Sequence, residues 1–319
     1  MLIANEGALN ELRRFGRAFS GMKRPDFGVL REALSKMGRV HLVEPERPRR
    51  PVVAVDGSYQ TVGTAYPYLL TLIQAVALPV SSCGKPLIGH RLFTPLFPEE
   101  QAELEMRASD QESIEKAAES RVRELMAEVE LTVACQAAAK HKGALVLLDG
   151  GFIHFRARGG SLFDQLVEKI TWNECLLIGV IEEISSRMLG TSADGLWEKG
   201  APVHDREILY GCLAVGEAFV VSRAVRKDEQ IGTVFARFAA HPQPVGFDYL
   251  AAQEEKVLQA LGELRALTPL DGRGVPAAID IADRYVRLTA AEVEQLVAAT
   301  VPAAVQEFFL RAHRLRRTI

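Results

Sequence analysis

The sequence has few cysteines and no cysteine pair typical of a metal or redox site. Its four cysteines, Cys83, Cys135, Cys175 and Cys212, lie far apart in a chain of 319 residues, and none belongs to a C-x-x-C motif. Zinc sites and the disulfide frameworks of small secreted domains need closely and regularly spaced cysteines. The pattern therefore argues against both kinds of site, and it favours a reducing cytoplasm.

The sequence also lacks an apolar run long enough to cross a membrane. The longest apolar stretch, residues 66–80, is interrupted by Pro67 and Gln74 and is shorter than a membrane-spanning helix. The first twenty residues contain no apolar core followed by a small-residue cleavage site, and they are typical of an amphipathic helix instead. We therefore expect a soluble, cytoplasmic protein with no membrane partner.

The sequence also lacks a large excess of positive or negative charge. The 38 lysines and arginines are nearly balanced by 41 aspartates and glutamates, which gives a formal net charge of −3. Proteins that bind nucleic acid through their overall charge are usually strongly basic. Any DNA-binding surface must therefore be local. The basic segments 47–50 and 311–317 are candidates, although both could equally be solvated tails.

Helices are predicted at both ends of the chain. Residues 4–38 contain two helices separated around residues 21–25, and Asp26 is placed to cap the second one. The segment 44–51 contains three prolines and is predicted to be an extended connector. The last third of the chain is predicted to contain three helices: 250–267, 279–288 and one that opens at the capping box Thr289–Glu292.

The middle of the chain alternates between apolar runs and a charged helical stretch, which predicts an α/β domain. The runs 52–55 and 68–78 are joined by a short connector and predict an antiparallel hairpin. Two helices are predicted between Pro98 and Lys142, where apolar residues recur near helical spacing. Five more strands are expected, at 144–148, 175–181, 208–214, 218–221 and 231–238.

Two of the predicted strands end in an Asp-Gly pair, in VVAVDGS (52–58) and LVLLDGG (145–151). A buried strand delivers its terminal carboxylate to a fixed point at the sheet edge, and the glycine lets the chain turn away. On neighbouring strands, Asp56 and Asp149 would form a negative site that a divalent cation stabilises. Taken alone, either pair is more often an ordinary turn.

Further segments follow these two in an order more specific than any single motif. They are SRVRELMAEVELTVACQAA (120–138), LLIGVIEEISSRML (176–189), HDREILYGCL (204–213) and GVPAAIDIADRYVRLT (274–289). Together with the Asp-Gly strands they resemble the NurA family of DNA nucleases. The resemblance implies a ribonuclease H-like mixed sheet flanked by helices, with N-terminal and C-terminal helical extensions. Residues 1–50 would form a helical extension and basic connector, and residues 51–319 a NurA-like nuclease domain.

The resemblance also implies four ligands for divalent metal, usually Mn²⁺, with Mg²⁺ as the alternative. They fall on Asp56 at the first strand, Glu130 on the long helix, Asp149 at the next strand and Asp283 on the late helix. These hard cations prefer carboxylate oxygen, and two of them together can activate water and stabilise a leaving oxygen. Glu130 could instead be a solvated helix residue, and Asp283 an exposed charge paired with a nearby arginine.

Three basic residues near the predicted carboxylates are candidates for DNA contacts. Arg123 lies two helical turns before Glu130, where it could meet a phosphate or pair with a neighbouring glutamate. His154 and Arg156 follow the second Asp-Gly pair, where they could contact phosphates.

One position departs from the family pattern. NurA sequences commonly carry a lysine directly after the strand that corresponds to LLIGVI, whereas this chain has Glu182 and Glu183 there. A lysine balances phosphate charge, and a glutamate does not. Arg187 could substitute as a fourth DNA contact. The change leaves open either altered substrate handling or loss of activity.

Three functions follow as hypotheses. The first is a metal-dependent exonuclease or endonuclease that cuts single-stranded DNA or DNA ends in repair, as a homodimer working with a HerA-like hexameric ATPase. The second, an actin-like sugar or acetate kinase, is disfavoured because residues 246–319 lack further glycine-rich loops for a nucleotide. The third is a catalytically weakened NurA-fold subunit of a DNA-translocating ATPase, which Glu182 favours.

Overall fold

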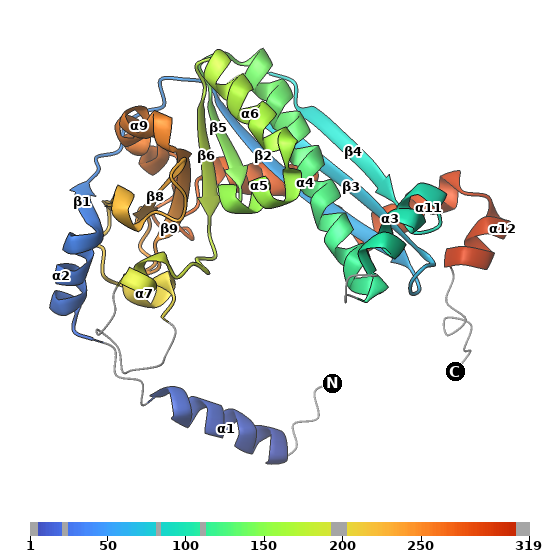
Figure 1. Ribbon diagram of the computed structural model, residues 1–319, viewed down its shortest axis with the longest axis horizontal. Coiled ribbons are helices and arrows are strands. Elements are labelled where there is room, and N and C mark those ends of the chain that lie inside the picture. The colour runs from blue at the N-terminus through green and yellow to red at the C-terminus, as the bar shows by residue number, and fades with distance from the viewer. Residues whose placement is uncertain (1–5, 21–24, 81–83, 109–112, 193–202, 311–319) are drawn as a thin grey trace.

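A mixed β-sheet forms the centre of the molecule (Figure 1). The computed structural model describes residues 6–20, 25–80, 84–108, 113–192 and 203–310. Within them, nine strands pair in the order β1-β7-β8-β9-β6-β5-β2-β3-β4. The strands are β1 Gly38–Leu42, β2 Val52–Gly63, β3 Leu69–Pro79, β4 Leu87–Phe93, β5 Leu145–Asp149, β6 Leu176–Ile181, β7 Glu217–Val221, β8 Ile231–Ala236 and β9 Val245–Leu250.

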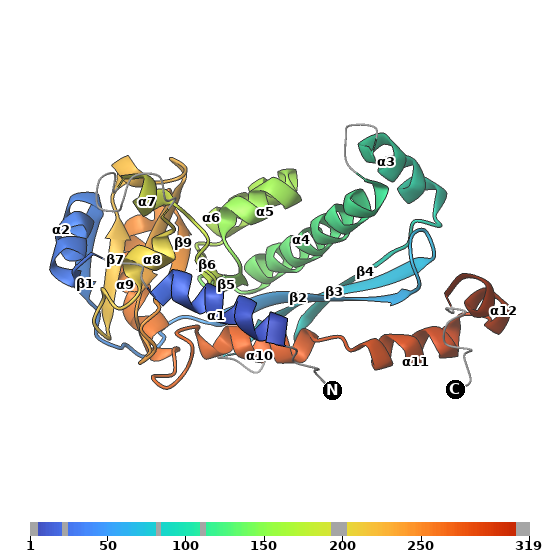
Figure 2. The same cartoon turned by 90° about the horizontal axis from the view of Figure 1, so that it is seen from below.

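Only the centre of this sheet is parallel: β5 pairs in parallel with β2 and β6, and the other neighbouring strands are antiparallel. Helices cover both faces, with α4, α5 and α6 on one side and α9 and α10 on the other (Figures 1 and 2). The helices of the described residues are α1 Glu6–Ser20, α2 Phe27–Met37, α3 Pro98–Ala108, α4 Ile114–Lys140, α5 Phe152–Gly159, α6 Ser161–Trp172, α7 Met188–Ser192, α8 Asp205–Leu209, α9 Glu254–Ala266, α10 Ala277–Val286, α11 Ala290–Thr300 and α12 Ala303–Val305. The predicted α/β architecture, a mixed sheet flanked by helices, is confirmed.

Strands β2 and β5 contribute side chains to a separate core on each face. Val53 and Val55 pack with α4 and α6, whereas Val52 and Ala54 pack on the face that carries α9 and α10. Burial on both sides explains why these strands are continuous apolar runs instead of alternating patterns. The two cores fix the positions of β2 and β5, and with them the positions of the acidic residues at their ends.

Several local predictions are confirmed. Asp26 caps α2 by accepting a hydrogen bond from the Gly28 amide at 2.8 Å. The connector 44–51 contains no helix or strand, and Thr289 opens α11 with a capping box. The hairpin of β2 and β3 and the helices α3 and α4 also form where they were expected.

Two predictions of local structure are wrong. The expected turn at Asp56 and Gly57 does not form, because β3 pairs with β2 as far as Gly63 and keeps the chain extended. The segment 208–214 is not a strand: its apolar residues belong to α8 and the turn after it, where Ile208 and Leu213 pack with α2 in a third core.

Three strands were not predicted, and each has a weak sequence signal. β1 and β4 lie at the two edges of the sheet and are largely exposed, so their sequences show little apolar alternation. β1 lies within the stretch that we assign to the N-terminal extension, and it pairs with β7. β9 ends at Leu250, so the helix expected from that residue starts at Glu254 instead. No helix among the described residues is both long and apolar enough to span a bilayer.

Asp248 on β9 fixes the chain that follows β5. Its carboxylate is 2% exposed and accepts hydrogen bonds from the Thr233 hydroxyl at 2.7 Å and from the Phe152 amide at 3.0 Å. Phe152 is the first residue of α5 and comes three residues after Asp149. A buried carboxylate from a distant strand therefore caps α5 and holds the turn beside Asp149.

Asp248→Ala is expected to lower the free energy of unfolding by about 1–3 kcal/mol, because two buried donors lose their acceptor. Urea denaturation measures the effect. Glu168→Ala, an exposed change on α6, is the control and should cost no more than about 0.5 kcal/mol. Equal stability of the two variants would contradict the capping role of Asp248.

Candidate metal centre

Asp56 and Asp149 lie side by side where β5 ends. The last register pair between the parallel strands β2 and β5 joins Val55 to Leu148, so the next residue on each strand is an aspartate. β5 stops at Asp149, whereas β2 continues to Gly63. Beyond Asp56, β2 therefore has no β5 strand beside it. Both carboxyl groups lie at the point where this pairing ends.

Glu130 reaches the same place from α4. Its side chain is 4% exposed and lies over Gly57, where an added Cβ atom would come within 2.7 Å of Glu130 Oε1. Only a residue without a side chain leaves room for the glutamate at this position. The Gly57 amide donates to Asp56 Oδ1 at 2.8 Å and also lowers the pKa of Glu130. This N–H group therefore acts on two carboxyl groups, one from a strand and one from a helix.

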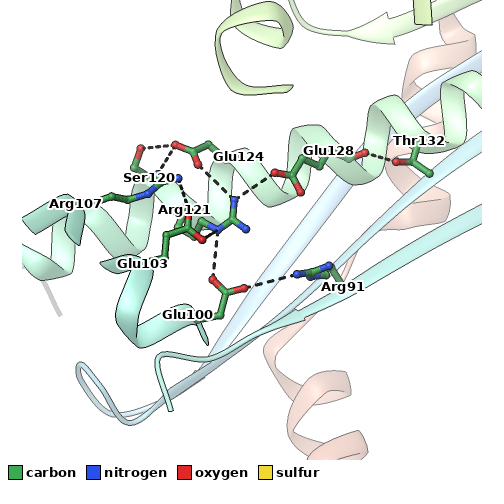
Figure 3. A network of polar contacts seen from close by, with 9 residues as sticks. All are labelled: Arg91, Glu100, Glu103, Arg107, Ser120, Arg121, Glu124, Glu128 and Thr132. Atoms are coloured by element: carbon green, nitrogen blue, oxygen red, sulfur yellow. Dashed lines mark hydrogen bonds and ion pairs between the residues drawn. The ribbon is translucent and has the colours of Figure 1, made fainter. Parts of the chain in front are cut away.

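The neighbouring glutamates of α4 point elsewhere (Figure 3). The guanidinium group of Arg121 contacts Glu128 at 3.3 Å and Glu124 at 3.6 Å, and it also contacts Glu100 of α3 at 3.3 Å. These contacts hold α3 against α4 and neutralise the glutamates on that side of the helix. Glu130 lies outside this network, over β2.

Asp283 completes the acidic group from the other face of the sheet. It is exposed on α10, and its charge raises the pKa of both Asp56 and Asp149. All four residues that sequence reasoning selected as ligands therefore lie within electrostatic range of a common point. Whether they bind metal stays a prediction.

Burial and mutual repulsion raise the pKa of three of these carboxyl groups. The pKa of Asp56 is raised to about 7, first by burial and then by the charges of Asp149 and Asp283. Burial, Asp56 and Asp149 place the pKa of Glu130 well above its usual range. The pKa of Asp149 is raised to about 6 by loss of surrounding solvent and by Glu182, while Arg273 opposes the rise. Close carboxylates of this kind carry an electrostatic cost that a cation relieves.

Arg273 is a residue of the site that sequence reasoning missed. Its guanidinium group contacts Glu182 Oε2 at 2.6 Å and Asp280 Oδ1 at 2.5 Å, and it lowers the pKa of Asp149. Glu182, the departure from the family pattern, is therefore paired with a cation. The only sequence signal was the position of Arg273, directly before the motif GVPAAIDIADRYVRLT.

The four predicted DNA contacts have different surroundings. Arg123 is half-exposed and pairs with Glu119 at 3.2 Å. His154 is exposed at the start of α5. Arg156 and Arg187 are engaged within the protein, by Asp228 at 2.6 Å and by the ring of His204 respectively. Their role in DNA binding stays a prediction.

Arg158, which sequence reasoning also missed, lies among the site residues. Its charge opposes the rise in the pKa of Glu130. Partial loss of solvent around the imidazole ring lowers the pKa of His154, and the charges of Arg158 and Arg123 lower it further. Burial and the charge of Arg123 in turn lower the pKa of Arg158 itself. Its position four residues after His154, on the same helix face, was the available signal.

The donor set fits a hard divalent cation. Four carboxyl groups supply the oxygen ligands that Mg²⁺ and Mn²⁺ prefer, and Gly57 leaves the space in which Glu130 lies against β2. Among the described residues, no three His, Cys, Asp or Glu side chains are already close enough to enclose an ion. These side chains would therefore have to move for metal binding.

A mixed sheet that is parallel only at its centre, flanked by helices and with Asp56 and Asp149 where β5 ends, is the architecture that the family resemblance predicts. The chain belongs to the NurA domain family, whose model matches residues 50–288. The predicted family resemblance is thereby confirmed. No curated protein sequence matches the chain.

Solved structures resemble this chain to different degrees, and the first of the three below shares its fold. The NurA nuclease from Sulfolobus solfataricus matches with a TM-score of 0.57 and 14% identity, over 94% of this chain and 96% of that chain. Endonuclease V from Bacillus subtilis gives a TM-score of 0.39 and 11% identity, over 85% of this chain and 92% of that chain. Endonuclease V from Ciona intestinalis gives a TM-score of 0.38 and 14% identity, over 84% of this chain and 96% of that chain.

The raised pKa of Asp56 predicts a pH-dependent stability in the presence of chelator. A carboxyl whose folded pKa lies at about 7, against an ordinary value of 3.8, favours the folded state when protonated. Stability is therefore present at low pH and falls as pH rises from about 4 to 7, by on the order of a few kcal/mol.

Asp56→Asn should reduce the fall in folding stability between about pH 4 and 7, because the asparagine amide does not ionise. Urea unfolding of both proteins in chelator at pH 4.5, 6 and 8 measures it, with these values chosen to bracket the titration. The same pH slope in parent and variant would show that Asp56 carries no such cost.

Proposed function

We propose that this chain is a divalent-metal-dependent deoxyribonuclease that hydrolyses phosphodiester bonds in single-stranded DNA or at DNA ends. The observation that carries the proposal is the convergence of Asp56, Glu130 and Asp149 at the open end of β5. Asp56 and Glu130 are buried and Asp149 is exposed beside them. Carboxylates held this close are costly to maintain, and a cation-dependent site explains why they are kept together.

Asp56, Glu130, Asp149 and Asp283 would hold Mn²⁺ or Mg²⁺. When bound, such ions supply an activated water and stabilise the leaving oxygen of a phosphodiester. The protein's own groups prepare the site. Gly57 orients Asp56 and Glu130 through one amide, and Asp248 fixes the chain beside Asp149.

Cations stand on two sides of the carboxylates. Arg273 lies beside Asp149, and Arg158 lies beside Glu130 with Arg123 and His154 near it. In this proposal the Arg158 side binds the phosphates of the incoming strand, and Arg273 keeps Asp149 ionised. A local cluster of this kind permits DNA binding by a chain whose net charge is −3.

Membership of the NurA family supports two further proposals, a homodimer and a HerA-like hexameric ATPase as partner in DNA repair. The basic tail at 311–317 lies outside the described residues. The alternative function, a weakened subunit of the ATPase complex, is motivated by Glu182. The ion pair with Arg273 argues against it, because the glutamate does not leave an uncompensated negative charge at the site.

Purified protein is expected to cleave end-labelled single-stranded DNA in Mn²⁺ and to stop when chelator is added. Asp56→Asn and Asp149→Asn should each lower the rate by at least about 100-fold, since each removes a metal ligand. Gel analysis of the products measures the rate. Glu168→Gln, a carboxylate removed from the surface of α6, should cleave at the parent rate. Full activity of Asp56→Asn, or activity in chelator, would overturn the proposal.

Arg273→Gln is expected to slow cleavage by about 10-fold or more, with a pH profile shifted to higher pH. Loss of the guanidinium group leaves Glu182 uncompensated and raises the pKa of Asp149 further. Arg206→Gln, which breaks the exposed ion pair with Glu183, is the matched control. A weakened subunit would instead show low activity in the parent and no change in pH profile in Arg273→Gln.

A further inference from the structure

A cavity of about 480 Å³ lies between α4 and the hairpin of β2 and β3. Its walls include the rings of Tyr59, Tyr66 and Phe93 and the side chain of Val122, and Glu115 and Glu119 stand among its lining residues. We call this space the Tyr59 pocket. Tyr59 is 43% exposed, so its ring is available to an entering group.

The Tyr59 pocket lies on the face of β2 that α4 covers, the face on which Glu130 also lies. Tyr59 follows Asp56 by three residues on β2, which is about 10 Å along a strand. On α4, Arg123 lines the pocket and precedes Glu130 by seven residues, again about 10 Å. Gly57 and Tyr59 alternate to the same side of β2, the side that faces α4. The cavity and Glu130 therefore share one face of the sheet.

Positive charge lies near both Glu130 and the pocket. Glu130 and Tyr59 both act electrostatically on Arg158, whose pKa is lowered first by burial and then by the charge of Arg123. Glu119 already pairs with Arg123, so Arg158 is the guanidinium group that an anion would stabilise here. A DNA phosphate has the charge and the geometry for that position.

The pocket itself excludes phosphate and favours a neutral ring. Glu119 is paired with Arg123 at 3.2 Å, so Glu115 is the lining carboxylate that repels an anion, and it can accept a hydrogen bond from an exocyclic amine. Tyrosine and phenylalanine walls suit a flat aromatic group. The positive charge of Arg158 attracts the phosphate of a nucleotide, and the acidic, aromatic lining of the pocket favours its base beside Tyr59.

We propose that the Tyr59 pocket receives one unstacked nucleobase of the DNA strand that is cut at the carboxylates. The inference rests on the proposed nuclease function and adds a substrate-binding site to it. A base reaches the pocket only when it is out of the duplex stack, so the pocket selects single strands and frayed ends over intact duplex.

The test compares a normal single strand with an abasic strand of equal length, which carries the same phosphates without bases. Binding is measured by fluorescence anisotropy in Ca²⁺, with the integrity of the strand checked on a gel. The parent protein is expected to bind the normal strand about 5- to 100-fold more tightly, the range that stacking of one base gives. Tyr59→Leu should lose that preference while its affinity for the abasic strand stays unchanged.

Three further variants identify the cause. Tyr59→Phe keeps the ring and should keep the preference. Ala118→Phe fills the cavity from α4 and should lose the preference as Tyr59→Leu does. Trp172→Leu removes an aromatic ring that is 84% exposed at the end of α6, and it should behave like the parent.

Each outcome separates this inference from the proposed function. If Tyr59→Leu weakens binding of both strands equally, or of neither, the Tyr59 pocket does not hold a base. If the parent cleaves DNA while every variant keeps the same preference for the normal strand over the abasic strand, the nuclease proposal stands. The proposed role of the Tyr59 pocket is then wrong. If the parent neither binds nor cleaves DNA, both fail.

Discussion

The burial of like charges at the end of β5 is the constraint on which the rest of the structure depends. Asp56 and Glu130 are almost fully buried, and each raises the electrostatic cost of ionising its neighbours. The cores on the two faces of β2 and β5 hold the backbone in place against this repulsion. Gly57 leaves the space in which the Glu130 side chain lies. Asp248 caps α5 and so holds the turn beside Asp149.

Sequence alone locates the parts of the site that depend on local pattern. Asp56 and Asp149 are found because each follows a buried apolar run, and the parallel register brings them together. Glu130 needed the family resemblance, since its helix carries glutamates on several faces and only the ion pairs of Arg121 separate them (Figure 3). Arg273 meets Glu182 across 91 residues, a contact that no local pattern predicts.

The errors of the sequence analysis have physical causes too. An Asp-Gly pair favours a turn, but continuous pairing with β3 keeps Asp56 and Gly57 in an extended strand. Edge strands such as β4 bury little and show a weak pattern. The apolar run at 208–214 is buried by tertiary packing in a helix and a turn, so its composition did not reveal its conformation.

The charge balance of the chain is consistent with a DNA-cutting function once the local arrangement is considered. Arg156 is paired with Asp228 and Arg123 with Glu119, whereas Arg158 acts electrostatically on Glu130. Glu130, Arg158 and the Tyr59 pocket lie on the side of β2 that α4 covers, whereas Asp56 alternates to the opposite face, where α10 carries Asp283. The proposed binding of a phosphate and a base uses the α4 side.

The central claim is that a divalent cation replaces protons among these carboxylates, and calorimetric titration with Mn²⁺ in two buffers of different ionisation enthalpy tests it most directly. At pH 6.5, below the pKa of about 7 for Asp56, binding should release about one proton or more. At pH 9 the release should vanish. Asp56→Asn should bind more weakly and release fewer protons. Binding without proton release at pH 6.5, or unchanged binding by Asp56→Asn, would contradict the account.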